Sequence, residues 1–249
     1  MLAKICDLSN SCKIVVVAAL QREINLLVKN WRVVLHELDG RRFKFFESES
    51  AVAVCAGIGF ETARRAAQAG VAIYHPQLFL SAGFAGALDK QLKVGQVFWP
   101  HRVIDASDGS RTEAAAGQGT LVSFSAVAGS SQKARLAAAY GAQAVDMEAA
   151  AVARTARAHG IAFAAVKAIS DEASLEMPDM SRFVTHDGQF RLAALVASAV
   201  VRPWLWPAFF RLGGNSAKAA RALCDELQRY LQKAGHTAAP ELQAAGGLN

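Results

Sequence analysis

The stretch 161-IAFAAVKAIS-170 is apolar at nearly every position, and Asp171 and Glu172 follow it directly. A near-continuous apolar run of this kind is typical of a strand that is buried on both faces, in a sheet covered by helices on either side. Similar runs recur along the chain at 13-KIVVVAA-19, 51-AVAVCAG-57, 77-QLFLSAG-83, 95-GQVFWP-100 and 143-QAVDM-147. The sequence therefore predicts a sheet of several buried strands.

Segments of helix-forming composition lie between these runs, the clearest being 60-FETARRAAQAGVAIYH-75 and 147-MEAAAVARTARAHG-160. Each ends near glycine or proline, as helices commonly do. The stretch 31-WRVVLHELDGRRFKFFES-48 predicts a hairpin that turns at Asp39-Gly40 and lies early in the sheet or at its edge. The fold class that we predict is α/β, a three-layer αβα sandwich around a mixed, mostly parallel sheet.

The chain has 249 residues, 53% of them hydrophobic, which suits one large core. We expect an N-terminal extension over residues 1–12, a single domain over 13–234 and a disordered tail over 235–249. Within the domain, 107-SDGSRTEAAAGQGT-120 is expected to be a flexible loop. No apolar run reaches the roughly 18 residues that a membrane-spanning helix needs. Because the N-terminus lacks a long apolar segment of signal-peptide type, we expect a cytoplasmic protein.

The composition argues against several kinds of partner. The four cysteines have no CxxC spacing, so free thiols are expected. The six histidines are scattered, without an i, i+4 pair or a nearby cysteine cluster, and predict no metal site. The net charge of +6 is mild and the basic residues are dispersed, which argues against nucleic acid but leaves an anionic substrate open.

The C-terminal part of the chain changes character after Arg202. The stretch 203-PWLWPAFFRLGG-214 is aromatic-rich and broken by prolines, and Asn215 or Ser216 is expected to cap a final helix. Two interpretations of the aromatic residues at 203–212 stay open. They pack against the domain, or they contact another subunit, a lipid-linked substrate or a membrane surface, which would make the protein membrane-peripheral.

Acidic residues follow three of the apolar runs. Glu23 follows the first run, Asp146 and Glu148 end the one near residue 143, and Asp171 follows the last, next to Ser170. Each acid taken alone could be a helix cap or a solvated loop residue. In an open α/β sheet, however, ligands bind beyond the carboxyl ends of the strands. Three such acidic groups together indicate a polar ligand site.

Two glycine loops belong to the same edge of the predicted sheet, Gly57-Ile58-Gly59 and 81-SAGFAGAL-88. The first is not a dinucleotide fingerprint, because Thr62 stands where the third glycine should be. Glycines still let the backbone approach a ligand closely, and amides at a helix start can hold an anion or a sugar hydroxyl. We therefore expect a small polar ligand, surrounded by carboxylates and backbone amides.

Six motifs in this order resemble the nucleoside phosphorylase and nucleosidase superfamily, in the branch that contains methylthioadenosine/S-adenosylhomocysteine nucleosidase. They are 19-ALQREI-24, 56-AGIG-59, 81-SAGFAG-86, 92-LKVG-95, 145-VDMEA-149 and 167-KAISD-171. The resemblance runs over about residues 13 to 200. The pattern from 186-HDGQF-190 through 203-PWLWPAFFRL-212 resembles the hopanoid-associated phosphorylases, a subgroup linked to cleaving adenine from adenosylhopane.

The resemblance implies a division of tasks among the acids. Cleavage of an N-ribosidic bond passes through an oxocarbenium-like cation, so the base must be protonated, the ribose held and a nucleophile presented. By resemblance, Asp171 is the general acid facing N7 of the purine, with Ser170 orienting it, and Glu23 is the general base. Glu148 is expected to bind the ribose hydroxyls, with Met147 under the sugar. Further substrate-binding residues implied by the resemblance lie in the glycine loops and in 119-GTLVSFSAVAG-129: Ile58, Gly83, Phe84, Phe124 and Val127.

The chain departs from the family pattern at the nucleophile. Phe84 stands where the nucleosidases have serine, and that loop carries no phosphate-binding arginine. Water and phosphate therefore both stay open, since Arg22 or Lys167 could hold a phosphate co-substrate. No other cofactor is implied. The resemblance implies an oligomer, at least a dimer.

The function that follows is cleavage of the N-glycosidic bond of a purine nucleoside, an adenosine with a 5′ substituent, with release of adenine by hydrolysis or phosphorolysis. The alternative is a nucleoside-binding protein that kept the fold and lost turnover, which Phe84 and the missing arginine favour.

Overall fold

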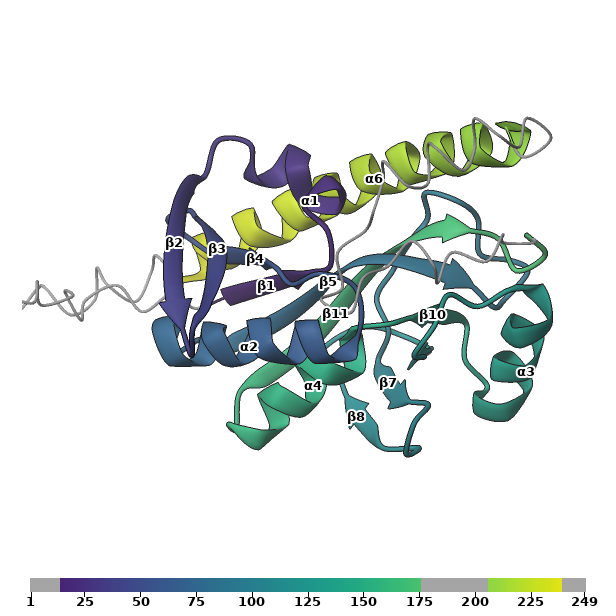
Figure 1. Ribbon diagram of the computed structural model, residues 1–249, viewed down its shortest axis with the longest axis horizontal. Coiled ribbons are helices and arrows are strands. Elements are labelled where there is room, and N and C mark those ends of the chain that lie inside the picture. The colour runs from purple at the N-terminus through teal and green to yellow at the C-terminus, as the bar shows by residue number, and fades with distance from the viewer. Residues whose placement is uncertain (1–13, 176–205, 239–249) are drawn as a thin grey trace, which may run out of the picture.

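The computed structural model describes residues 14–175 and 206–238 (Figure 1). Its strands are β1 (Ile14–Ala18), β2 (Arg32–Leu38), β3 (Arg41–Glu47), β4 (Val52–Cys55), β5 (Leu78–Ala87), β6 (Val97–Phe98), β7 (Arg102–Asp105), β8 (Arg111–Glu113), β9 (Thr120–Ser123), β10 (Ala144–Asp146) and β11 (Ala162–Asp171). Its helices are α1 (Gln21–Val28), α2 (Phe60–Tyr74), α3 (Ser130–Tyr140), α4 (Ala149–Ala158) and α6 (Trp206–Ala238).

The strands form one mixed sheet in the order β2-β3-β4-β1-β5-β10-β9-β7-β8, with β11 joined to β5 and β6. The central pairs β4–β1, β1–β5 and β5–β11 are parallel, as are β10–β9 and β9–β7. Strand β5 pairs with β1 over its first half and with β10 near its end, while β11 runs along nearly its whole length. The predicted mixed sheet is confirmed, with five parallel and five antiparallel pairs among the described strands.

Helices cover both faces of this sheet, as Figure 1 shows for α1 and α6 on one side and α2 and α4 on the other. Alternate residues of β1 belong to two different cores: Val15 and Val17 pack in the cluster that contains α2 and α4, and Val16 in the cluster that contains α1 and α6. Because successive side chains of a strand point to opposite faces, a strand covered on both sides must be apolar throughout. This explains the continuous apolar runs.

The predicted hairpin is present as β2 and β3, which pair antiparallel from Arg32 with Glu47 to Leu38 with Arg41. Asp39 and Gly40 have φ angles of 51° and 71°, as a type I′ turn requires. Strand β2 lies at the edge of the sheet, which agrees with the prediction.

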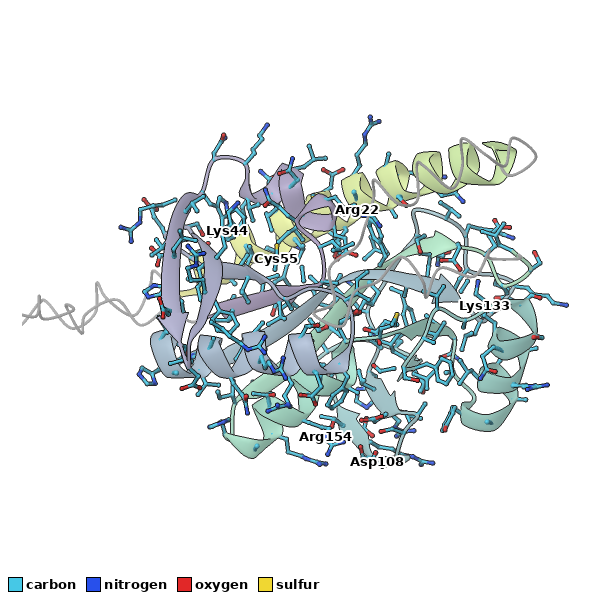
Figure 2. The ribbon with its side chains drawn as sticks, in the orientation of Figure 1. Arg22, Lys44, Cys55, Asp108, Lys133 and Arg154 are labelled. Atoms are coloured by element: carbon cyan, nitrogen blue, oxygen red, sulfur yellow. The ribbon has the colours of Figure 1, made fainter. Side chains whose placement is uncertain are left out.

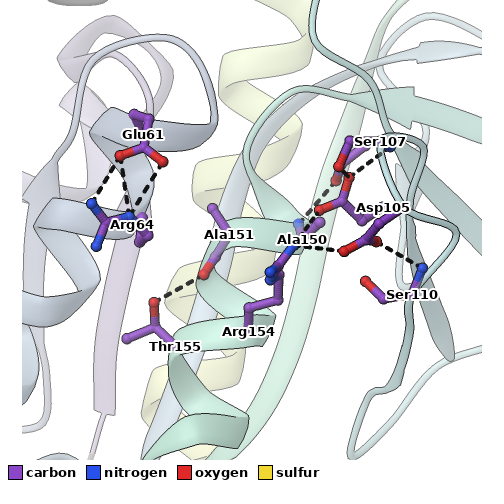
Figure 3. Close-up of polar contacts among 11 residues, drawn as sticks. Glu61, Arg64, Asp105, Ser107, Ser110, Ala150, Ala151, Arg154 and Thr155 are labelled. Carbon is purple, nitrogen blue, oxygen red and sulfur yellow. Dashed lines mark hydrogen bonds and ion pairs between the residues drawn. The ribbon is translucent and has the colours of Figure 1, made fainter.

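The prediction of a flexible loop over residues 107–120 was wrong for residues 111–113, whereas residues 114–119 contain neither helix nor strand. Arg111–Glu113 form β8, which pairs antiparallel with β7. The turn between them is held by hydrogen bonds from the amide and hydroxyl of Ser107 to Asp105 Oδ1 (2.9 and 2.6 Å). Arg154 of α4 adds ion pairs to Asp105 (3.2 Å) and Asp108 (2.9 Å), part of the cluster in Figure 3. Polar residues whose composition is typical of a loop here form the hydrogen bonds and ion pairs that hold a turn against a helix.

Helix α6 begins at Trp206 and continues without a break through residues 213–216, so the expected cap at Asn215 or Ser216 was wrong. A glycine inside a helix costs only about 1 kcal/mol, and burial of the helix's apolar stripe offsets that. Leu223, Leu227 and Leu231 of this stripe pack in the core that contains α1.

Several expectations concern parts of the chain outside the described residues. These are the extension at 1–12, the motif at 186–190, the contacts of the aromatic segment 203–212, and the tail from residue 239. Residues 235–238, expected in the disordered tail, belong to α6. Within the described residues, Cys55 and Cys224 are free thiols. None of the described helices combines the length and apolarity needed to cross a membrane.

Candidate active site

The carboxyl ends of β1, β10 and β11 and the second half of β5 surround a pocket of about 180 Å³. Among the residues predicted from the sequence, eight line it: Glu23, Ile58, Phe84, Val127, Met147, Glu148, Ser170 and Asp171. Arg22 and Lys133, labelled in Figure 2, reach the pocket from α1 and α3. The sheet edge therefore brings together side chains that are far apart in the sequence.

Two predicted residues are not among those that line the pocket. Gly83 is buried in β5, where an added Cβ atom would lie 3.1 Å from Oε2 of Glu23. This glycine makes room for a pocket carboxylate. Phe124 packs instead against the small apolar cluster that contains Leu136 of α3.

Glu23 lies in the first turn of α1 and its side chain is buried. The amide of Leu20 donates to the Oε2 atom of Glu23 (3.2 Å), so part of the role of Glu23 is to cap the N-terminus of α1. Burial raises the pKa of Glu23 above its ordinary value, and the Leu20 amide and the charges of Lys167 and Arg22 act in the opposite direction. A carboxyl group with a raised pKa is suited to exchanging protons near neutral pH.

The two acids of 145-VDMEA-149 have different roles. Asp146 caps α4, because its Oδ2 atom accepts the amide of Ala149 (2.8 Å). Its Oδ1 atom accepts the hydroxyl of Ser123 (2.5 Å), and its Oδ2 atom forms a buried ion pair with Lys167 (2.9 Å). The cap interpretation of Asp146, which the sequence left open, therefore holds.

Glu148 is turned away from the helix that it precedes. The amide of Gly59, at the start of α2, donates to its Oε1 atom (2.8 Å), and the amide of Met147 to Oε2 (3.3 Å). Burial, followed by the charge of Asp146, raises the pKa of Glu148 to about 8, against the opposing effect of Lys167. Glu148 thus presents a carboxyl group to the pocket from a backbone-anchored position.

Asp171 is held by two side chains. The hydroxyl of Ser170 donates to Oδ1 (2.6 Å), and the ammonium group of Lys133 forms an ion pair with Oδ2. Lys133 also donates to the carbonyl oxygen of Glu172 (2.7 Å). Gly86 of β5 passes close by, so that an added Cβ atom would lie 2.9 Å from Asp171 Oδ2.

The sequence prediction missed Lys133. It is a single lysine in 129-GSSQKARLAAAY-140, without a motif around it, and only the docking of α3 beside β10 brings it to the pocket. No local signal distinguishes it from a solvent-exposed lysine. In the described residues there is no group of three or more His, Cys, Asp or Glu side chains suited to a metal ion.

The family model described as "Phosphorylase superfamily" matches residues 13–129 and 107–203. No curated protein sequence matches the chain significantly.

Three solved structures are similar in fold. Futalosine hydrolase of Helicobacter pylori has a TM-score of 0.67 at 17% identity, with 90% of this chain and 98% of that chain covered. The 5′-methylthioadenosine/S-adenosyl homocysteine nucleosidase of the same organism has a TM-score of 0.67 at 17% identity, with 90% and 100% covered. S-adenosylhomocysteine nucleosidase of Streptococcus pyogenes, in complex with 5-methylthiotubericidin, has a TM-score of 0.67 at 18% identity, with 91% and 99% covered.

Proposed function

The chain belongs to the phosphorylase superfamily, and we propose that it is an enzyme that cleaves the N-glycosidic bond of a purine nucleoside, an adenosine with a 5′ substituent. The observation that carries this proposal is that Glu23 of α1, Glu148 between β10 and α4, and Asp171 at the end of β11 line one pocket. The similar solved structures include nucleosidases for methylthioadenosine and S-adenosylhomocysteine, which supports the choice of a 5′-substituted adenosine.

The three acids divide the chemistry as follows. Glu148 binds the ribose hydroxyls through hydrogen bonds. Asp171 delivers a proton to the departing base. Glu23 draws a proton from the nucleophile, a role that its burial and raised pKa support.

The nucleophile is water or phosphate. Arg22 lines the pocket beside Glu23, where a guanidinium group could hold a phosphate ion. The C-terminal resemblance to hopanoid-associated phosphorylases adds a lipid-linked nucleoside to the candidate substrates. We further propose a cytoplasmic homo-oligomer, in membrane-peripheral form if the segment 203–212 meets lipid.

The test is release of free base from methylthioadenosine, S-adenosylhomocysteine, futalosine, adenosine and inosine, each with and without phosphate. We expect release from at least one 5′-substituted adenosine, and phosphate dependence separates phosphorolysis from hydrolysis. Asp171→Asn should abolish most activity, whereas Asp108→Asn, at an exposed position outside the pocket, should not. Base release that is unchanged in Asp171→Asn would sink the mechanism.

A second candidate function is nucleoside binding without turnover. Two features favour it. Phe84 lies in the pocket where the nucleosidases have serine. Asp171 forms an ion pair with Lys133, whereas a general acid was expected to carry a proton. Tight binding of a nucleoside in calorimetry, with no base released after prolonged incubation, would select this function over the enzyme.

A further inference from the structure

Lys133 is a buried cation in direct contact with the proposed general acid, and the roles of Glu23, Glu148 and Asp171 do not require it. We propose that Lys133 and Asp171 act as one proton-donating unit, in which the ammonium group supplies the proton that reaches the departing purine. The inference rests on the proposed function, since it concerns the leaving group of that reaction.

The hydrogen bonds around Asp171 are those of an acceptor. Its Oδ1 atom accepts the Ser170 hydroxyl and its Oδ2 atom accepts Lys133 Nζ. A carboxylic acid must donate from one of its oxygens, whereas an ionised carboxylate only accepts. The proposed transfer therefore starts from the ion pair, with the proton on the ammonium group of Lys133 and Asp171 as the acceptor.

The surroundings also suit the state in which Asp171 holds the proton. The Ser170 hydroxyl has a second acceptor, the carbonyl oxygen of Ala85 at 3.3 Å. Lys133 keeps the carbonyl of Glu172 at 2.7 Å. When the carboxylate takes up a proton, the Ser170 hydroxyl and the Lys133 side chain can therefore each donate to another acceptor.

The position of Lys133 is not explained by helix stability. It lies near the start of α3, where the helix dipole disfavours a cation, and only 2% of its surface is exposed. Lysines are almost never buried so fully unless they are paired. Gly86 leaves room for this pair, because an added Cβ atom would lie 3.2 Å from Cε of Lys133 as well as close to Asp171.

The proposed step conserves atoms and charge. The proton passes from Nζ of Lys133 through Asp171 to N7 of the purine, while the C1′–N9 bond breaks and its electron pair stays on the purine. The ribosyl carbon, now cationic, is taken by phosphate, or by water whose proton passes to Glu23 and from there to solvent. Lys133 is left as a neutral amine and regains a proton from solvent before the next turnover.

The experiment compares Lys133→Arg and Lys133→Met on two kinds of substrate. One is the purine nucleoside that the wild type cleaves fastest. The other is 4-nitrophenyl β-D-ribofuranoside, whose leaving group departs as a phenolate and needs no proton. Arg135→Met, an exposed cation two residues along the same helix, is the matched control.

We expect both Lys133 variants to lower kcat for the purine nucleoside ~100-fold or more, the range typical of general acid catalysis. KM should stay within about threefold, because ground-state binding does not need the transferred proton. Cleavage of the nitrophenyl riboside should stay within about threefold of the wild type, since the variants keep every other catalytic part. Arg135→Met should match the wild type on both substrates.

Two results would overturn the inference. The first is wild-type kcat in Lys133→Arg, because a guanidinium keeps the charge but does not give up its proton, so Lys133 would only position Asp171. The second is an equal loss on both substrates in variants whose thermal melts match the wild type, because loss of a proton donor alone would spare the nitrophenyl riboside. If the wild type does not accept the nitrophenyl riboside, the kcat of Lys133→Arg on the purine nucleoside decides alone.

Failure of the proposed function can be told apart from failure of this inference. A wild type that releases no base from any purine nucleoside contradicts the proposed function itself, whereas full turnover in Lys133→Met contradicts only the role of Lys133.

Discussion

Lys167 Nζ lies 2.9 Å from Asp146 Oδ2, and both side chains are buried although they come from different strands, β11 and β10. Lys167 is paired in register with Gly83 of β5, and an added Cβ atom on that glycine would lie 3.8 Å from the ammonium group. Lys167 also donates a hydrogen bond to the hydroxyl oxygen of Ser81 (3.1 Å). This ion pair joins the two strand ends that carry Glu148 and Asp171.

Removal of one partner from this pair should destabilise the fold strongly. We expect Asp146→Ala to lower the free energy of unfolding by about 3–5 kcal/mol, because it leaves Lys167 as an uncompensated buried charge and removes the α4 cap. The measurement is urea denaturation followed by circular dichroism. The double variant Asp146→Ala/Lys167→Met should lose less than the sum of the single variants, and strict additivity would contradict the coupling.

The raised pKa of Glu148 predicts a specific pH dependence of stability. Between its ordinary pKa of 4.5 and its folded value of about 8, the folded protein keeps a proton that the unfolded chain releases. The free energy of unfolding should therefore fall as pH rises through this window. The free energy of unfolding, measured by urea denaturation at several pH values in this window, should change less steeply with pH in Glu148→Gln than in the wild type. The exposed Glu37→Gln is the control, and identical slopes in all three proteins would refute the assignment.

Gly86→Ala should damage the Lys133–Asp171 pair without unfolding the protein. Its Cβ atom would lie 2.9 Å from Asp171 Oδ2, closer than such contacts normally occur, so the carboxyl group must move. A misplacement of about 1 Å near the chemistry can cost on the order of 100-fold in rate, so we expect kcat to fall by 10- to 100-fold on that basis. Steady-state kinetics and a thermal melt check this. Gly214→Ala, where an added Cβ meets open space, should leave kcat unchanged.

Cys55 should be unreactive in the folded protein. Burial, and then the charge of Glu23, raise the pKa of its thiol to about 12, so that very little thiolate exists near neutral pH. Mass spectrometry after brief iodoacetamide treatment at pH 8 should find Cys55 unmodified in the native protein and modified in urea. Rapid labelling of native Cys55 would show that the strand end is open to solvent.

The sequence alone was enough for the sheet and for most of the pocket. A strand buried on both faces must be apolar at every position, so 13-KIVVVAA-19 and 161-IAFAAVKAIS-170 could be recognised without knowing their neighbours. Because parallel strands end at one edge, the acids that follow the runs could also be placed together. Eight of the ten predicted site residues line one pocket, and their roles stay predictions.

Features that depend on long-range packing could not be predicted in this way. Helix α6 continues through Gly213-Gly214, although glycines are typical of helix ends. Residues 107–113 are held in place around Asp105 and Arg154, although their composition is typical of a loop.

The division between local and tertiary information is clearest at Asp171. The sequence by itself determined that this acid ends a buried strand next to Ser170, because the apolar run and its polar end are local features. Only the tertiary structure decided that Lys133, 38 residues earlier, is its partner. A lysine carries no local mark of the carboxylate it will meet, since burial of its charge depends on where α3 docks and on the space that Gly86 leaves.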